Sequence, residues 1–193
     1  MARRKYEFRP DKMGSGILNK LYITRKQWAG ILKWSLYALV LLVMSVVQDV
    51  MLSRVRLFGA TTDLVPCAII LICVIQGAEN GSIFILVASA LYLFSGSAPD
   101  HYTIAFLPIL GLCAAMFRQG YLRKGFSAAF LCAGVAMMLY ELAIFVGGLM
   151  MLQTTPERLR AFLLTGAYSL LAMPVLYPIC TSIDRIGGET WKE

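Results

Sequence analysis

Positions Leu52–Gly96 read LSRVRLFGATTDLVPCAIILICVIQGAENGSIFILVASALYLFSG, and they contain two short apolar stretches, Leu64–Ile75 and Ile83–Phe94. Only the polar residues Gln76–Ser82 separate the two. Because backbone groups in lipid must be hydrogen-bonded within the chain, two apolar runs with so short a link predict an antiparallel helical hairpin. Each run makes about 20 Å of helix, against a hydrocarbon core about 30 Å thick. We therefore expect a hairpin that is short for a bilayer and that the other helices must accommodate.

The composition indicates that lipid surrounds most of the chain. It has 193 residues, of which 59% are hydrophobic, and its mean hydropathy is +0.69. A soluble domain of this size has no core large enough to hide so much apolar surface. We therefore predict a single all-α integral membrane domain that crosses the cell membrane several times.

The net charge of +7 is concentrated near the N-terminus, where residues 1–33 hold nine of the 18 Lys and Arg. A basic segment ahead of the first apolar run is typical of a cytosolic arm close to anionic lipid headgroups. We prefer this interpretation to nucleic-acid binding, because the arm leads directly into a membrane chain. A cleavable signal peptide is not expected, since the first apolar run begins only near residue 28.

The chain is divided into a basic cytosolic arm at 1–27, a six-helix membrane domain at 28–181 and a cytosolic tail at 182–193. The hairpin supplies two of the six helices. The other four are expected at Trp28–Val47, Thr103–Phe117, Ser127–Met150 and Leu159–Thr181. Pro174 and Pro178 should bend the last turns of the sixth helix. The short charged segment Val50–Phe58 should lie at the membrane interface.

The distribution of basic residues favours a cytosolic location for both termini. With six crossings, 14 of the 18 Lys and Arg fall in the inward-facing segments 1–33, 76–82, 118–126 and 182–193. The other four face outward: Arg54, Arg56, Arg158 and Arg160. The same count holds if the hairpin at 64–95 enters and leaves from outside, so a spanning and a re-entrant hairpin both remain open.

Small residues recur at every seventh position on two of the predicted helices. On the second arm of the hairpin they form two adjacent columns, Gly81, Ala88, Ser95 and Ser82, Ser89, Gly96. On the fifth helix the column comprises Ser127, Gly134, Glu141 and Gly148. Small residues let helix backbones approach closely in lipid, and a period of seven matches left-handed, near-parallel packing. We interpret these columns as helix-contact faces.

Glu141 is the clearest ionisable residue inside an apolar helix, where a charge costs about 2.5–3.5 kcal/mol or more. Its place in the small-residue column predicts that it faces another helix. Two interpretations stay open: a buried carboxyl bonded across helices to a hydroxyl, amide or backbone group, or a site for a proton or ligand. Asp63 directly precedes the first arm of the hairpin, where a carboxylate would cap the helix and complement its dipole.

Little in the sequence points to catalysis. It has no phosphate-binding GxxxxGK[ST] loop, no cluster of His, Cys or carboxylates at metal-ligand spacing, and a single histidine, His101. The five cysteines lie in apolar runs without a CxxC pair, and we interpret them as small core residues. We therefore expect no catalytic residue, no metal and no cofactor.

A set of features along the chain forms a pattern: an unpaired first helix, the stretch Leu57–Val65, a short helix ending in Gln76-Gly77, a turn with Glu79 and Gly81, a small-residue helix ending in Ser95-Gly96, and Tyr140-Glu141-Leu142. Together these features resemble the rod shape-determining MreD family. The resemblance covers about residues 35–180.

The resemblance implies a non-enzymatic scaffold of the cell-elongation machinery in a rod-shaped bacterium. Its partners would be MreC, MreB filaments, the glycosyltransferase RodA and a class B penicillin-binding protein. The implied fold is similar to the six-helix substrate-binding subunits of energy-coupling-factor transporters, so a vitamin-like substrate-binding subunit is the alternative function. Those subunits usually carry an Ala-x-x-x-Ala motif in their first helix. This helix has only Ala29 and Ala38, which favours the scaffold.

The charge distribution generates a prediction about topology. On a background without native cysteines, Asn19→Cys should stay unlabelled when intact cells are treated with a membrane-impermeant maleimide, because the basic arm is expected in the cytosol. The same reagent should label it once the cells are permeabilised. Labelling in intact cells would contradict the predicted orientation.

Overall fold

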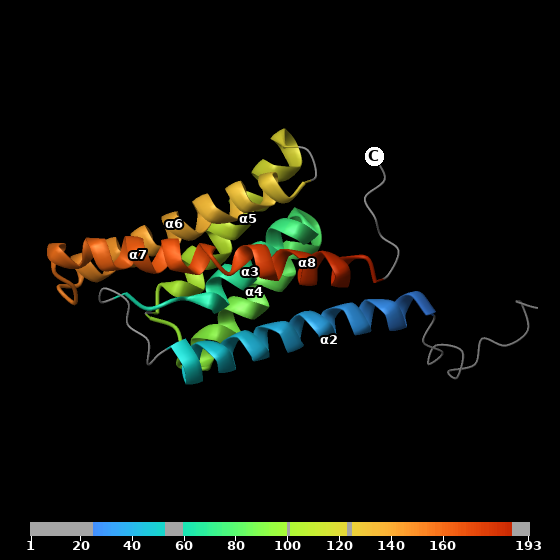
Figure 1. Cartoon of the computed structure of the whole chain (residues 1–193), viewed down its shortest axis with the longest axis horizontal. Helices are drawn as coiled ribbons and strands as arrows, with labels where there is room; N and C mark the ends of the chain where they lie inside the picture. The colour runs from blue at the N-terminus through green and yellow to red at the C-terminus, as the bar shows by residue number, and fades with distance from the viewer. Residues whose placement is uncertain (1–24, 53–59, 100, 123–124, 187–193) are drawn as a thin grey trace, which may run out of the picture.

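A computed structural model describes residues 25–52, 60–99, 101–122 and 125–186, which fold as a bundle of helices (Figure 1). Most of the predicted interfacial segment, Val50–Phe58, lies outside the described residues. The long elements are α2 (Arg25–Val46), α3 (Leu64–Gln76), α4 (Ala78–Phe94), α5 (Thr103–Tyr121), α6 (Phe126–Met150), α7 (Leu159–Leu170) and α8 (Met173–Asp184). The short ones are a π-helix, η2 (Val47–Leu52), and a 3-10 helix, η3 (Pro156–Arg158).

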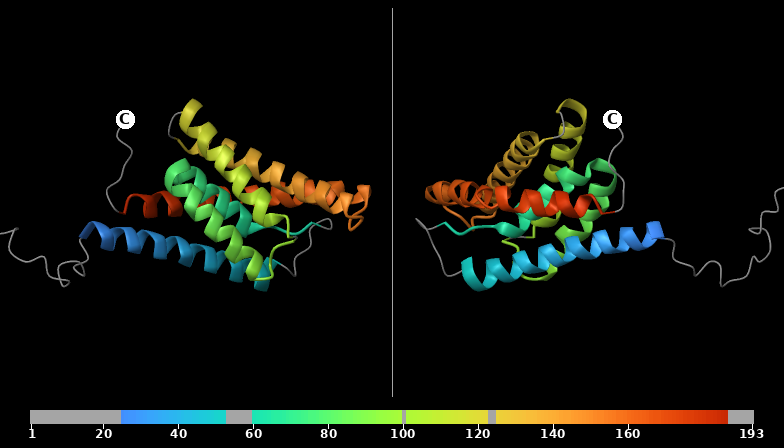
Figure 2. Two further views of the ribbon diagram at one scale, coloured as in Figure 1. Left: turned by 180° about the vertical axis from the view of Figure 1, so that it is seen from behind. Right: turned by 45° about the vertical axis from the view of Figure 1, so that its right-hand side comes forward.

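Helix α3 occupies the centre of the bundle, in contact with α2, α4, α5, α6, α7 and α8 (Figures 1 and 2). Every residue from Leu64 to Gln76 is buried. A helix that is apolar on all sides is stable when it is surrounded, and here the other helices of the same chain surround it. Pro66 fits in its first turn, where a missing N–H costs no hydrogen bond. The short length of α3 is therefore no mismatch with a bilayer, because α3 packs against protein.

Side chains from other helices complete the hydrogen bonding at both ends of α3. The N–H of Val65 donates to Oε1 of Gln48 at 3.0 Å, and the N–H of Asp63 donates to Oγ of Ser169 at 2.8 Å. At the other end, the Arg118 guanidinium donates to the carbonyl oxygen of Val74 at 2.6 Å. Helix ends leave backbone groups without intrahelical partners, and such groups are costly when buried. Tertiary packing thus supplies the caps that water gives to an exposed helix.

The connection from α3 to α4 is shorter than the predicted break at Gln76–Ser82. Gly77 alone makes the turn, with a φ of 84°, and α4 begins at Ala78. Helix α5 likewise continues past the predicted end at Phe117 to Tyr121. Within this longer helix, the Arg118 guanidinium reaches the carbonyl oxygen of Val74 in α3.

Helix α2 continues into residues that were expected to end it. The apolar run stops at Gln48-Asp49, yet the π-helix η2 carries the chain on to Leu52. In a π-helix each hydrogen bond spans one more residue than in an α-helix. Gln48 lies in this widened segment, where its side chain is buried and reaches α3. Figure 2 shows α2 running along one side of the bundle.

The sixth predicted helix is divided into α7 and α8, and the chain bends by 48° between them. The break lies at Leu171-Ala172, just before Pro174. Proline has no N–H to bond the carbonyl of Leu170, so the helix cannot continue straight. The bend predicted from the prolines is present, and it lies nearer the middle of the predicted helix than its end.

By length and composition, three helices can cross a membrane: Trp28–Val50, α5 and α6, with the bent pair α7–α8 as a fourth. Their outer surfaces are apolar, and so is the outer surface of the shorter α4, which exposes Ile83, Leu86, Val87, Leu91 and Phe94. An exposed apolar surface on this scale is typical of a protein surrounded by lipid. The elements of the described part of the chain are all helical, and the protein is embedded in a membrane.

The buried face of α4 includes part of the two small-residue columns. Gly81, Ala88 and Ser89 are buried. Gly81 makes the closest approach, since an added Cβ would lie 2.7 Å from the carbonyl oxygen of Cys73 in α3. This face packs within the chain, against α3 and α5.

The remaining members of the two columns lie elsewhere. Ser95 and Gly96 are exposed beyond the end of α4, so they do not belong to the contact face. The hydroxyl of Ser95 donates to the carbonyl of Tyr92 at 2.7 Å, and Gly96 has a φ of 74°. Ser82 is half-buried, and its hydroxyl donates to the carbonyl of Glu79 at 2.8 Å. Ser95 and Gly96 therefore end the helix.

An ion pair joins the first and last helices that the structure describes. Nζ of Lys33 in α2 lies 2.7 Å from Oδ1 of Asp184 in α8. The two ends of the described chain therefore meet at one end of the bundle, as Figure 1 shows.

The packing of α4 generates the second prediction. Ala88→Leu and Ser89→Leu should each lower the free energy of unfolding by roughly 1–3 kcal/mol, because the larger side chain overfills a closed contact. The measurement is thermal unfolding of the purified protein in detergent. Leu91→Ile, on the exposed side of the same helix, is the control. Equal tolerance at all three positions would contradict the buried face.

Candidate functional site

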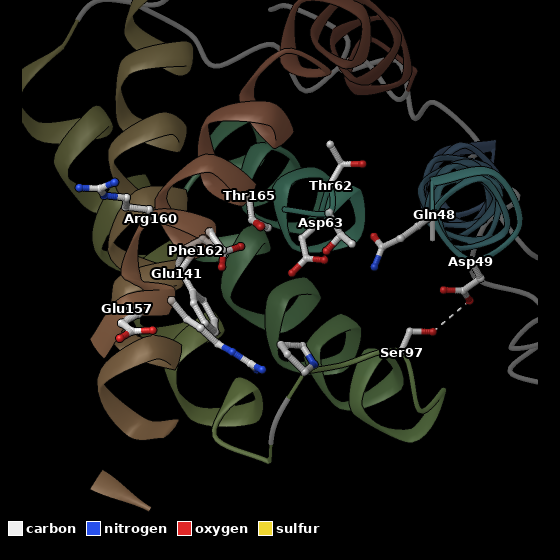
Figure 3. A pocket seen from close by; sticks show the side chains of 14 residues that line it. Gln48, Asp49, Thr62, Asp63, Ser97, Glu141, Glu157, Arg160, Phe162 and Thr165 are labelled. Atoms are coloured by element: carbon white, nitrogen blue, oxygen red, sulfur yellow. Dashed lines mark hydrogen bonds between the residues drawn. The ribbon is translucent and has the colours of Figure 1, made fainter. Parts of the chain in front are cut away.

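A pocket of about 860 Å³ opens at the end of the bundle opposite the Lys33–Asp184 pair. Its lining comes from the first residues of η2, the segments before α3 and after α4, the middle of α6, the short η3 and α7 (Figure 3). We call it the polar pocket, and its lining residues are Gln48, Asp49, Thr61, Thr62, Asp63, Ser97, Pro99, Glu141, Glu157, Arg158, Arg160, Ala161, Phe162 and Thr165. It combines four carboxyl groups with two guanidinium groups.

The inner wall of the polar pocket is formed by buried or half-buried side chains from four elements. Gln48 comes from η2, Asp63 from the segment before α3, Glu141 from α6 and Thr165 from α7. The outer wall consists mainly of exposed residues: Asp49, Pro99, Glu157, Arg158 and Arg160. The pocket therefore narrows from a charged, wet opening to a polar interior.

Glu141 is the most enclosed acid of the polar pocket, with 2% of its surface exposed. It lies well inside α6, and α7 passes close to it at Gly166. A Cβ added to Gly166 would lie 3.3 Å from Cγ of Glu141. Within the described part of the chain, Oε1 of Glu141 has no hydrogen-bond partner. The bond across helices that one interpretation predicted is therefore not made by this oxygen, and the carboxyl lines a pocket.

Asp63 lies at the start of α3, as predicted, but its carboxylate makes no capping hydrogen bond. The amide oxygen of Gln48 takes that role, by accepting from the N–H of Val65. The carboxyl of Asp63 instead lines the polar pocket. Burial raises the pKa of this carboxyl from 3.8 to about 6, because the charged form loses hydration.

The carboxyl groups of Asp63 and Glu141 both point into the polar pocket (Figure 3). The residues are far apart in the sequence, yet both side chains line the same pocket. Among the described residues the one ion pair is Lys33–Asp184, so neither acid has a cationic side chain as its partner there. Two carboxyl groups without an ion-pair partner are costly to ionise in a partly dehydrated site.

The outer wall is fixed mainly through Asp49. Its Oδ2 accepts a hydrogen bond from the hydroxyl of Ser97 at 3.0 Å, which links η2 to the segment after α4 (Figure 3). The guanidinium of Arg160 points away from the two inner acids. Apolar contact surface comes from Phe162, Pro99 and Ala161.

The small-residue column of α6 serves packing around the pocket. Gly134 is buried against Leu170 of α7, whose Cδ2 would lie 3.5 Å from an added Cβ. Gly148 is buried too, but its close neighbour is Thr154 in the connection after α6, at 3.1 Å, and not another helix. Ser127, at the start of the column, is exposed.

Three residues of the site region escaped prediction from the sequence: Gln48, Thr165 and Ser169. Gln48 had a visible signal, since it is an amide at the end of an apolar run. Thr165 and Ser169 had none, because hydroxyl residues are common in membrane helices and bond to their own backbone. Ser169 does so, donating to the carbonyl of Thr165 at 2.8 Å while it accepts from Asp63.

The polar pocket has the features of a binding site. Its size lies within the range of about 300–1,000 Å³ that is typical of small-molecule sites. No group of three or more His, Cys, Asp or Glu side chains is placed to hold a metal ion in the ranges that the structure describes. Compared with protein family models, curated proteins and solved structures, the chain matches none of them.

The raised pKa of Asp63 generates the third prediction. The folded state favours the neutral carboxyl, so the associated stability is fully present below about pH 4 and is lost as the pH rises through about 6. Asp63→Asn mimics the neutral form. Between these limits the free energy of unfolding of the wild type should fall by at most about 3 kcal/mol relative to that of this variant. The measurement is the unfolding temperature of both proteins as a function of pH. Identical pH profiles of the two proteins would contradict the burial of Asp63.

Proposed function

We propose that this chain is a non-enzymatic membrane scaffold of the bacterial cell-elongation (rod) complex, as its resemblance to the MreD family implies. In this role it supports cell shape and peptidoglycan synthesis through helix contacts with an MreC-like protein. A class B penicillin-binding protein, a RodA-like glycosyltransferase and MreB filaments are the further partners. No chemical step is assigned to it.

One observation carries this proposal: several residues of the MreD-like sequence pattern are buried where helices of the bundle contact one another. Gln76 and Gly77 are buried at the turn between α3 and α4, and Gly81 packs against the backbone of α3. Tyr140 and Glu141 are buried in α6. Residues that set the relative positions of helices are the ones on which the shape of a scaffold depends.

The proposed fold has six membrane crossings with both termini in the cytosol, similar to the substrate-binding subunits of energy-coupling-factor transporters. The burial of α3 supports it, since a short helix at membrane depth is tolerated when protein encloses it. The meeting of α2 and α8 at one end of the bundle is consistent with two termini on one side. A re-entrant hairpin formed by α3 and α4 is the alternative.

The surfaces open to protein partners are the apolar outer faces of the helices. The small-residue face of α4 is occupied by α3 and α5, so it is not available to a partner. The opposite face, with Ile83, Leu86, Val87, Leu91 and Phe94, is exposed. Helix α2 is exposed along most of its length, since only 6% of its apolar segment is buried. We propose that MreC-like helices pack against these faces.

The polar pocket favours a second candidate function, a small-molecule binding subunit of a membrane transporter. The size and polar interior of the pocket suit such a role. The missing Ala-x-x-x-Ala pair in the first helix argues against it. Purification from native membranes discriminates the two, because a transporter subunit should bring down a transporter ATPase and a scaffold an MreC-like protein.

Variants of Glu141 provide the fourth prediction. If this residue serves the fold of a scaffold, Glu141→Gln should support rod shape in a strain depleted of the wild-type protein, because the amide keeps the shape and hydrogen-bonding capacity. Glu141→Leu removes them and should weaken the fold modestly. The readout is cell shape by microscopy.

Membrane levels of each variant, measured by immunoblot, are the control for that experiment. A Gln variant present at the normal level in cells that have become round would show that the carboxyl itself is required. Cells that keep their rod shape without any copy of the protein would contradict the scaffold role altogether.

A further inference from the structure

The interior of the polar pocket holds two carboxyl groups that form no ion pair with a described cationic side chain. Asp63 and Glu141 face it from two different elements. Glu141 is 2% exposed, and its Oε1 has no hydrogen-bond partner in the described part of the chain. A buried carboxyl oxygen that faces a cavity and lacks a hydrogen-bond partner indicates that a molecule with a hydrogen-bond donor enters the cavity.

The residues that line the pocket indicate which kind of molecule carries that donor. Hydroxyl and amide groups of Thr165, Thr61 and Gln48 surround the acids, and Phe162 and Pro99 add apolar surface nearby. A bare metal ion needs closely spaced ligands at about 2–2.6 Å, whereas this pocket measures about 860 Å³. Its size suits an organic molecule, and its two acids suit a cationic group on that molecule.

We propose that the polar pocket binds a small organic molecule through a protonated amine held between the carboxyl groups of Asp63 and Glu141. The ammonium donates hydrogen bonds to both acids, and its carbon skeleton lies against Phe162 and Pro99. This inference goes beyond the scaffold role and does not depend on it. If the chain is a transporter subunit, the inferred substrate class is small organic amines.

The test uses four probes with one four-carbon skeleton and different charges. 1,4-Butanediol is neutral, 4-amino-1-butanol carries one ammonium, putrescine carries two, and 4-hydroxybutyrate carries a carboxylate. Each is added at millimolar concentration to the purified full chain in lipid nanodiscs at about pH 8, which lies above the ordinary pKa of carboxyl groups and below that of aliphatic amines. Thermal unfolding is followed with a thiol-reactive dye on a Cys113→Ser background, since Cys113 is exposed and the other four cysteines are buried in the folded protein.

The two amines should raise the unfolding temperature by about 3 °C or more once they reach about ten times their dissociation constant. The diol and the carboxylate should not. Glu141→Gln and Asp63→Asn should each reduce the shift by at least half while they keep the folded state. Glu79→Gln is the matched control, because Glu79 is exposed at the other end of the bundle, and it should keep the full shift.

Chemical labelling of the wild-type protein gives a second readout that needs no variant. Dicyclohexylcarbodiimide reacts with buried carboxyl groups, and the modified residue is identified by peptide mass spectrometry. Labelling of Glu141 should fall severalfold in the presence of 4-amino-1-butanol and remain unchanged with 1,4-butanediol.

Several results would overturn the proposal. They are an equal shift with the diol and the amines, an amine shift that survives Glu141→Gln, or stabilisation by sodium or calcium ions without any by amines. A shift that appears only in an Arg158→Gln variant would also contradict it, since a cation that lines the pocket would then be the partner of the acids. Because binding is measured on purified protein, its failure leaves the rod-shape test of the scaffold unaffected.

Discussion

The enclosure of α3 by the other helices is the constraint on which the rest of the structure depends. A helix whose whole length is buried has no water at its ends, so its terminal N–H and C=O groups must find partners in the protein. Gln48, Ser169 and Arg118 supply those partners from η2, α7 and α5. The π-helix after α2, helix α5 and helix α7 therefore each contribute one residue to the ends of α3.

The short length of α3 also accounts for the polar pocket. Helix α3 has 13 residues and α6 has 25, so α3 begins inside the bundle and not at its surface. The space beyond its first residue is bounded by the longer α6 and by α7. Polar groups gather there because the start of a helix attracts them, and because Gly166 allows α7 to pass close to Glu141. Asp63 and Glu141 become neighbours in this way.

The hydrophobic pattern predicted the helix bounds well, but it did not predict which side chains contact one another across helices. The bounds of α3 and α6 lie within one residue of the prediction, because polar or small residues flank both apolar runs. The bend before Pro174 follows from the covalent structure of proline alone. The inward turn of Gln48 and the reach of Arg118 to Val74 were not predictable, since each depends on which helix lies alongside. The pairing of Asp63 with Glu141 was missed for the same reason, although each residue had been singled out by itself.

The central claim is that α3 is shielded from lipid by its own chain, and lipid-phase photolabelling tests it most directly. A lipid-soluble carbene precursor is activated in nanodiscs that contain the full chain, and the labelled peptides are mapped by mass spectrometry. We expect label on α2 and on the exposed side of α4, at residues such as Leu86 and Leu91, and essentially none between Leu64 and Gln76. Labelling of α3 at a level similar to α4 would contradict the account, because it would place the hairpin in the bilayer as an independent unit.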